Sequence, residues 1–203
     1  FPYVLGMATA NHGWALMMQG RTEAGIALLR DGVATEDRTG AAVSRPSYLG
    51  MLAAAHLMEG DRKSGVARLD EGLAALERVK RTSGLPVITD VHEASQVRAA
   101  VAVVDALQVP AFLCRQTDLL IAAGAGGVPV NIKKGQWMAP EEMAGAVEKV
   151  RAGGCQDIAV TERGTTFGYG DLVVDMRSFE RLRASTAAAV LFDATHAVQQ
   201  PGR

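Results

Sequence analysis

Residues 128–138, VPVNIKKGQWM, join a short apolar run to two adjacent lysines, a glycine and a glutamine. A β-branched run of this length is typical of a strand that is covered on both faces of a parallel sheet. Helix-forming sequence at residues 118–123 and 139–152 supplies the crossover connections that parallel strands need. Lysines fit such a strand only at its end, where the carboxyl edge of a β/α sheet meets ligands. The stretch therefore predicts an anion-binding strand end, with a solvated pair of loop lysines as the alternative.

Strand-like and helix-like sequence alternates from about residue 71 onward. This alternation specifies a parallel sheet with helical crossovers, either an open doubly wound sheet or a (β/α)8 barrel. The expected strands lie in residues 85–93, 107–114, 128–134, 157–164 and 188–197, and the expected helices lie in residues 94–106, 115–126, 139–152 and 176–184.

Polar residues at the ends of the five expected strands favour the barrel. An open sheet would concentrate ligand chemistry at one switch point and carry a glycine-rich first turn, but no GxGxxG follows a strand here. The clusters are Asp90, His92 and Glu93; Cys114, Arg115 and Gln116; Lys133, Lys134 and Gln136; Glu162, Arg163 and Gly164; and Asp193, Thr195 and His196.

The first 70 residues contain an internal repeat. MQGRTEAGIALLRDG at residues 18–32 and MEGDRKSGVARLDEG at residues 58–72 align at an offset of 40. Each unit combines a helix, a tight glycine turn and a second helix, and this resembles a tetratricopeptide-type repeat. We therefore expect repeats over residues 1–70 and a partial barrel over residues 71–203. The repeats are either a surface for a partner or an orphan scaffold, and having only two units favours the scaffold.

Composition excludes several classes of function. The chain has 203 residues, of which 48% are hydrophobic, and its 21 Lys+Arg nearly balance its 22 Asp+Glu. A net charge of −1 gives no global attraction to nucleic acid or an anionic membrane. No apolar run is long enough to span a membrane, and Cys114 and Cys155 match no metal or redox spacing. These features predict a cytoplasmic protein that binds neither nucleic acid nor membrane.

Five motifs together resemble 3-deoxy-D-manno-octulosonate 8-phosphate synthases over residues 71–200. They are ITDVHEASQ, VPAFLCRQTDLL, VNIKKGQWMAPEEM, TERGTTFGYGDLVVDM and FDATHAVQ, in this order. The resemblance implies condensation of phosphoenolpyruvate with arabinose 5-phosphate, for lipopolysaccharide sugar synthesis. The alternatives are another phosphoenolpyruvate-condensing synthase, which makes a seven-carbon or sialic-type sugar acid, and a non-catalytic repeat-containing interaction protein.

The same resemblance implies binding roles for five residues. Lys133 and Arg163 would hold phosphoenolpyruvate, Arg115 and the backbone at Cys114 would position its phosphate, and Gln136 would contact substrate through its amide. A guanidinium pairs with an anion in a bidentate way, and a lysine adds a compact charge. A surface salt bridge is the alternative for each cation alone, but cations at three successive strand ends favour a site.

The remaining candidates concern the sugar and the reacting carbons. Asp90 and His92 share one face if extended, so they either orient a sugar hydroxyl or form a polar network at the barrel mouth. His196 resembles a family histidine that holds one divalent metal ion in one branch, and its expected role is catalytic, together with Lys133. Phe167 and Tyr169 are expected to shape the mouth by packing.

The chain also departs from the family pattern. Family barrels carry two strands before ITDVHE and further segments after the histidine strand, whereas this chain has helical repeats before that motif. We expect a chimeric or truncated product in which phosphate-side contacts persist while sugar selection and turnover are weak. The family resemblance further implies a homo-oligomer.

Overall fold

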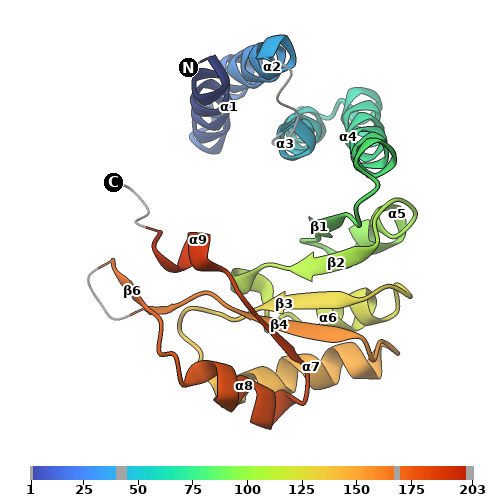
Figure 1. Ribbon diagram of the computed structural model, residues 1–203. Coiled ribbons are helices and arrows are strands. Elements are labelled where there is room, and N and C mark those ends of the chain that lie inside the picture. Colours follow the sequence, from blue (N-terminus) through green and yellow to red (C-terminus); the bar gives the residue numbers. More distant parts are fainter. Residues whose placement is uncertain (1, 40–44, 167–169, 200–203) are drawn as a thin grey trace. The chain divides into compact units, whose positions relative to one another are not determined.

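The computed structural model describes residues 2–39, 45–166 and 170–199, and these fall into two compact units. The first unit is Phe1–Gly84 and the second is Leu85–Arg203 (Figure 1). Helix α4 (Arg62–Ser83) continues without a break through residue 70, where the sequence suggested a domain boundary. It ends at Gly84, whose φ of 66° forms a left-handed C-cap that a side chain would strain. The two units therefore divide at Gly84 rather than at residue 70.

The first unit consists of helices joined in pairs by tight turns. These helices are α1 (Pro2–Met18), α2 (Thr22–Thr39), α3 (Arg45–Met58) and α4. Gly20 and Gly60 occupy the two equivalent turns with φ values of 80° and 81°. The helices and turns thus lie where the 40-residue repeat places them, while their tetratricopeptide character stays a prediction.

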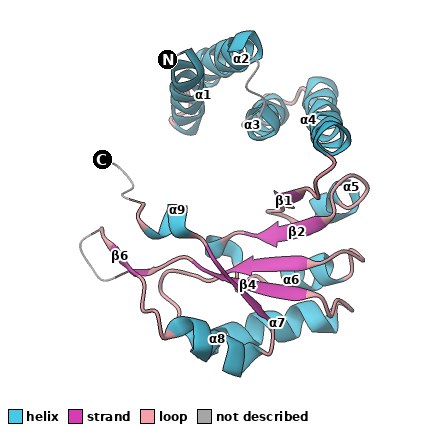
Figure 2. Cartoon of the chain, in the orientation of Figure 1, coloured by secondary structure: helices cyan, strands magenta, loops and turns pink. Residues whose placement is uncertain are grey.

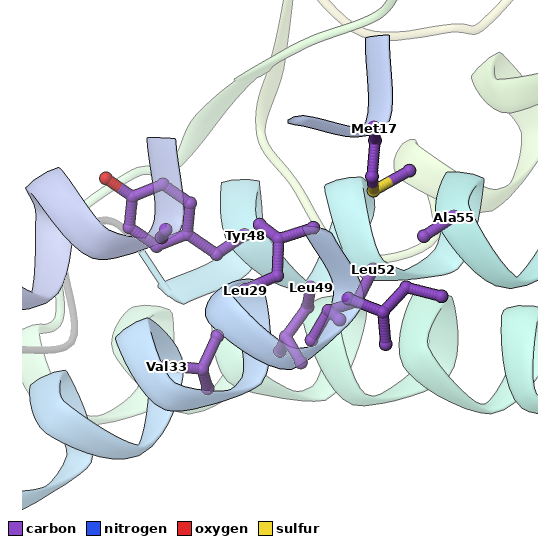
Figure 3. Close-up of a cluster of buried hydrophobic side chains, with 9 residues drawn as sticks. Met17, Leu29, Val33, Tyr48, Leu49, Leu52 and Ala55 are labelled. Atoms are coloured by element: carbon purple, nitrogen blue, oxygen red, sulfur yellow. The ribbon is translucent and has the colours of Figure 1, made fainter. Parts of the chain in front are cut away.

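One apolar cluster holds α1, α2 and α3 together (Figure 3). Leu29 and Leu49 are fully buried in it, and Trp14 packs on its margin. The other labelled members in the figure are Met17, Val33, Tyr48, Leu52 and Ala55. Among the described residues, no helix is both long enough and apolar enough to cross a membrane.

The second unit is built on a five-stranded parallel sheet in the order β1-β2-β3-β4-β7 (Figure 2). Helices α6, α7 and α8 pack against this sheet. Five parallel strands with helical crossovers confirm the predicted partial (β/α)8 barrel. The strands are β1 (Ile88–Asp90), β2 (Ala106–Val109), β3 (Val130–Lys133), β4 (Ile158–Glu162) and β7 (Ala189–Phe192), and the helices are α6 (Thr117–Gly124), α7 (Met143–Ala152) and α8 (Ser178–Thr186).

Alternation along the strands separates the core from the site. Leu107, Val109, Ile132 and Val160 are fully buried. Successive side chains of a strand point to opposite faces, so Lys133 lies on the other face from Ile132. The apolar residues of β2, β3 and β4 thus anchor the sheet, while Lys133 is available for chemistry.

Two details differ from the sequence-based expectation. The helix expected over residues 94–106 is only a 3-10 turn, η1 (Ala94–Gln96), followed by α5 (Val97–Ala100), because the valines that follow have low helix propensity. An unpredicted antiparallel hairpin of β5 (Thr165–Thr166) and β6 (Leu172–Val173) follows β4. The remaining short elements are η2 (Ala111–Leu113), η3 (Pro140–Glu142) and α9 (Ala194–Ala197).

A close approach of α6 and α7 makes Gly124 a sensitive position. A Cβ added at Gly124 would lie 2.1 Å from the carbonyl oxygen of Val150, whereas a Cβ at Gly145 would meet open space. We expect Gly124→Ala to lower the free energy of unfolding by about 1–3 kcal/mol, because the helices must separate. Gly145→Ala should raise it by roughly 0.5–1 kcal/mol, because alanine restricts the unfolded chain. Urea denaturation measures both changes in unfolding free energy. Equal unfolding midpoints for the two variants would contradict the close contact between α6 and α7.

Candidate functional site

The candidate site lies at the carboxyl edge of the sheet. Because the five strands are parallel, their last residues meet at one edge, which is where ligands bind in β/α-barrel proteins. Asp90, Lys133 and Glu162 are the last residues of β1, β3 and β4, and Asp193 directly follows β7. The structure thus brings most of the predicted strand-end clusters to one rim.

Lys133, Asp193 and His196 form one connected group on this rim. The Lys133 Nζ donates to Asp193 Oδ2 over 2.7 Å, and the His196 Nδ1 lies 2.7 Å from the same oxygen. Asp193 is also the N-cap of α9, because its Oδ1 accepts the backbone N–H of His196 over 3.0 Å. The carboxylate therefore orients both predicted catalytic residues and leaves Nε2 as the outward ring nitrogen of His196.

Electrostatics keep Asp193 ionised. Burial alone would raise its pKa, but the His196 N–H and the Lys133 ammonium outweigh burial and lower the pKa to about 2. The Lys133 and Asp193 side chains are 17% and 13% exposed, so solvent screens their pairing less than at an open surface. The contact with Asp193 consequently holds the Lys133 side chain in place before any ligand arrives.

Arg163 is a buried cation with an unfilled donor. Arg163 as a whole is 4% exposed, and its Nη2 donates to the Gln199 Oε1 over 2.9 Å. Its Nη1 has no hydrogen-bond partner among the described residues. Burial lowers the pKa of Arg163, while the carboxylates of Asp193 and Glu162 act in the opposite direction. A buried arginine with a free N–H is suited to an anion that completes its hydrogen bonding.

The two adjacent lysines have different environments. Lys133 reaches Asp193, whereas Lys134 is 0% exposed and lies with its Nζ 3.5 Å from the Glu162 Oε1. Burial lowers the pKa of Lys134, and the neighbouring Glu162 carboxylate partly opposes that shift. The alternative interpretation, a solvated pair of loop lysines, is therefore wrong.

Asp90 takes part in a hydrogen-bond chain across four strands. The Thr161 hydroxyl donates to the Asn131 Oδ1 over 2.7 Å, and the Asn131 Nδ2 donates to the Gln108 Oε1 over 2.8 Å. The Gln108 Nε2 then donates to the Asp90 Oδ1 over 2.7 Å. An ionised carboxylate can only accept, so Asp90 fixes the direction of the chain. This geometry matches the polar-network alternative for Asp90, and its contact with a sugar stays a prediction.

Three predicted residues are not linked to the Lys133 group by contacts within the described chain. His92 is exposed, and its backbone N–H donates to the Gln96 side chain. Arg115 is exposed as well, and its carbonyl accepts from Lys149. Gln136 has a buried Oε1 without a partner in the described part of the structure.

Cys114 faces away from open solvent. Its Sγ lies 3.3 Å from the Met138 Sδ, and burial raises the pKa of the thiol. Its backbone N–H donates to the Ala111 carbonyl over 3.4 Å, so phosphate binding by this backbone stays a prediction. Phe167 and Tyr169 lie outside the described residues.

Sequence reasoning did not assign roles to Asp193, Gln108, Asn131 and Thr161. Asp193 directly follows a strand and precedes His196 by three residues, which is the N-cap spacing that could have indicated it. Asn131 precedes Lys133 by two residues and therefore shares its face. The partner of each amide could not be derived, because it depends on the register between strands.

The sheet also has a hollow of about 470 Å³ at its other end. Its lining includes Ile88, Ala106, Pro129, Ile158 and Ala189 at the amino ends of the strands, together with Leu191 further along β7. The lining is largely apolar and contains none of the cations of the rim. We therefore place the chemistry at the carboxyl edge.

A divalent metal ion at His196 is not supported by a complete ligand set. Its Nδ1 is engaged by Asp193, and only its Nε2 is left for a metal. Among the described residues, no three or more His, Cys, Asp or Glu side chains are grouped so as to hold one. The metal role of His196 stays a prediction.

The lowered pKa of Asp193 predicts a loss of stability in acid. Its folded pKa of about 2 lies below the usual value of 3.8, so the carboxylate stabilises the fold above pH 4. This contribution should disappear as the pH falls from about 4 toward 2. Asp193→Asn should flatten that part of a plot of unfolding free energy against pH. An unchanged slope in the variant would contradict the Lys133 and His196 contacts as its cause.

A parallel β/α sheet with a buried arginine and a paired lysine at its carboxyl edge defines a protein of the β/α-barrel class with cationic side chains at its rim. The model of the DAHP synthetase I family matches residues 66–203, which include the whole rim. The chain belongs to the DAHP synthetase I family.

Relatives with a more specific name match the same part of the chain. A protein of Syntrophotalea carbinolica named 2-dehydro-3-deoxyphosphooctonate aldolase is 58% identical over 134 residues, which cover 66% of this chain and 48% of the relative. Proteins of the same name from a Cyanothece species and Syntrophobacter fumaroxidans are 55% and 58% identical over 134 residues, covering 66% of this chain and 49% and 46% of themselves. The chain spans about half the length of these relatives.

Proposed function

We propose that the chain takes part in condensing phosphoenolpyruvate with arabinose 5-phosphate to give 3-deoxy-D-manno-octulosonate 8-phosphate and phosphate. The observation that carries this proposal is the 55–58% identity to relatives named for the octulosonate product. The rim supports it independently, because Lys133 and Arg163 offer cationic donors to a dense anion. Lys133 would act as a donor whose position Asp193 fixes, and Arg163 would act as a buried guanidinium whose Nη1 is open to the ligand.

The proposed reaction joins two carbons and releases phosphate. Carbon 3 of phosphoenolpyruvate bonds to the aldehyde carbon of the sugar, whose oxygen takes up a proton. Water supplies the new oxygen at carbon 2 and loses both of its protons, one to the sugar oxygen and one to the departing phosphate. The bond from carbon 2 to the phosphate oxygen breaks as the carbonyl at carbon 2 forms. Lys133 and Arg163 would hold phosphoenolpyruvate, and His196 Nε2 would accept a proton or orient the water.

Three further assignments belong to this proposal. A single divalent ion at His196 would polarise the sugar aldehyde when bound, but its other ligands are not identified. A cytoplasmic location is consistent with the free thiols of Cys114 and Cys155. Assembly into a homo-oligomer is carried over from the family resemblance alone.

The experiment is a paired assay on the purified chain. Calorimetry measures phosphoenolpyruvate binding, and phosphate release is measured with arabinose 5-phosphate or with a four-carbon aldose phosphate as the aldehyde. The proposal expects saturable phosphoenolpyruvate binding, and it expects phosphate release that depends on the five-carbon sugar. Preference for the shorter sugar would favour a seven-carbon synthase. Folded chain that binds no phosphoenolpyruvate would overturn the proposal and leave the interaction-protein alternative.

A further inference from the structure

Lys134 is a buried charge that the proposed reaction does not use. Its Nζ lies 3.1 Å from the Thr165 Oγ1, 3.3 Å from the Gly135 carbonyl and 3.4 Å from the Met138 carbonyl. The Glu162 carboxylate lies 3.5 Å away as its counter-ion. A lysine without solvent is costly to bury, and these oxygens replace its water shell.

The oxygens around Lys134 come from two loops at the rim. Gly135 and Met138 belong to the loop after β3, where the Met138 N–H closes a turn onto the Gly135 carbonyl over 3.0 Å. Glu162 and Thr165 belong to the segment from the end of β4 to β5. One ammonium group therefore contacts both loops at once.

The same two loops carry candidate substrate-binding residues. Gln136 lies within the first loop, and its carbonyl accepts the Thr166 N–H over 2.8 Å. Arg163 lies within the second, where its backbone N–H donates to the Glu162 Oε1 over 3.0 Å. The Gly164 N–H donates to the same oxygen over 2.7 Å. One oxygen of Glu162, Oε1, thus accepts the backbone N–H groups of Arg163 and Gly164 and also faces the Lys134 ammonium.

We propose that Lys134 is a positioning residue that holds the loop of residues 135–138 against residues 162–166 and so presents Gln136 and Arg163 to the anionic substrate. This inference rests on the proposed function for the identity of the substrate. Lys133 and Lys134 then have separate tasks, since Lys133 reaches the ligand side and Lys134 orders the frame behind it. If the Lys134–Glu162 pair served stability alone, the Lys134 ammonium would not need to contact both loops.

The test is the charge-balanced double variant Lys134→Met/Glu162→Gln. Methionine keeps most of the apolar stem of lysine, and the glutamine Oε1 can still accept the N–H groups of Arg163 and Gly164. Hydrogen exchange over residues 135–138 and 163–166 and calorimetry with phosphoenolpyruvate are the two measurements. The control Arg183→Met/Glu180→Gln removes one charge of each sign from the exposed surface of α8.

We expect exchange in both loops to become at least tenfold faster, with β3 unchanged, and phosphoenolpyruvate to bind at least tenfold more weakly. Wild-type exchange, or wild-type affinity, in a folded double variant would overturn the inference. If the unmodified chain binds no phosphoenolpyruvate, the proposed function fails, but the exchange rates still decide whether Lys134 orders the loops.

A milder variant keeps the test valid if the double variant does not fold. Thr165→Val removes one oxygen partner of the Lys134 Nζ and keeps the side-chain shape. It should speed exchange over residues 135–138 about twofold to fivefold, and Thr165→Ser should restore the original rate. No change with Thr165→Val would count against the bridging role.

Discussion

Replacing Lys133 and Arg163 together by alanine should weaken phosphoenolpyruvate binding by at least about 100-fold. Hydrogen bonds to charged groups contribute roughly 1.5–3 kcal/mol each, so two such contacts correspond to about 10²–10⁴ in affinity. Asp193 adds to the loss, because without Lys133 its carboxylate repels the incoming anion. Calorimetry on the full chain measures the effect directly.

The matched control removes two positive charges elsewhere in the same unit. Arg177 pairs with Asp175 and Arg181 with Glu141, both at exposed positions near α8. The variant Arg177→Ala/Arg181→Ala should bind phosphoenolpyruvate within about threefold of the unmodified chain, since solvent and salt screen charges at exposed positions. Equal losses in the two variants would mean that net charge, rather than the rim, attracts the ligand.

The second large effect should follow Lys134→Met alone. This change leaves the Glu162 carboxylate, 1% exposed, without its cation, and breaking one side of a buried ion pair costs about 3–5 kcal/mol. Urea unfolding of the second unit can be followed through Trp137 in a Trp14→Phe background, because the chain has only two tryptophans. We expect the midpoint of this transition to fall sharply.

Adding Glu162→Gln to Lys134→Met should recover more than half of that loss. The recovery is expected because the uncompensated charge is removed, although the Glu162 and Lys134 contacts are not rebuilt. If the single and double variants unfold at the same urea midpoint, the Glu162 carboxylate does not need Lys134 as its counter-ion. The stability readout and the loop-exchange readout are therefore independent tests of the same buried pair.

Much of the second unit could be predicted from local sequence. Apolar β-branched runs gave the five strands, and polar residues placed directly after them gave the rim. The helix over residues 94–106 was overestimated, because the valines there satisfy the pattern of an apolar face while disfavouring helix. The β5–β6 hairpin was missed, because two-residue strands have no period to detect.

The candidate site was predictable as a set of residues and not as a set of contacts. Lys133, Arg163 and His196 were named from their positions, but the link through Asp193 joins residues 60 apart in sequence. The unfilled Nη1 of Arg163 likewise follows from burial, which no local pattern reports.

The sequence by itself determined the parallel β/α architecture, the edge that carries the chemistry and the family to which the chain belongs. These features depend on period, propensity and motif order, all of which are local. Only the tertiary structure decided that Lys133 faces Asp193 while Lys134 is buried with Glu162. Lys133 ends β3 and Lys134 directly follows it, and the loops of residues 135–138 and 162–166 that pack around Lys134 determine which of the two identical side chains loses its water.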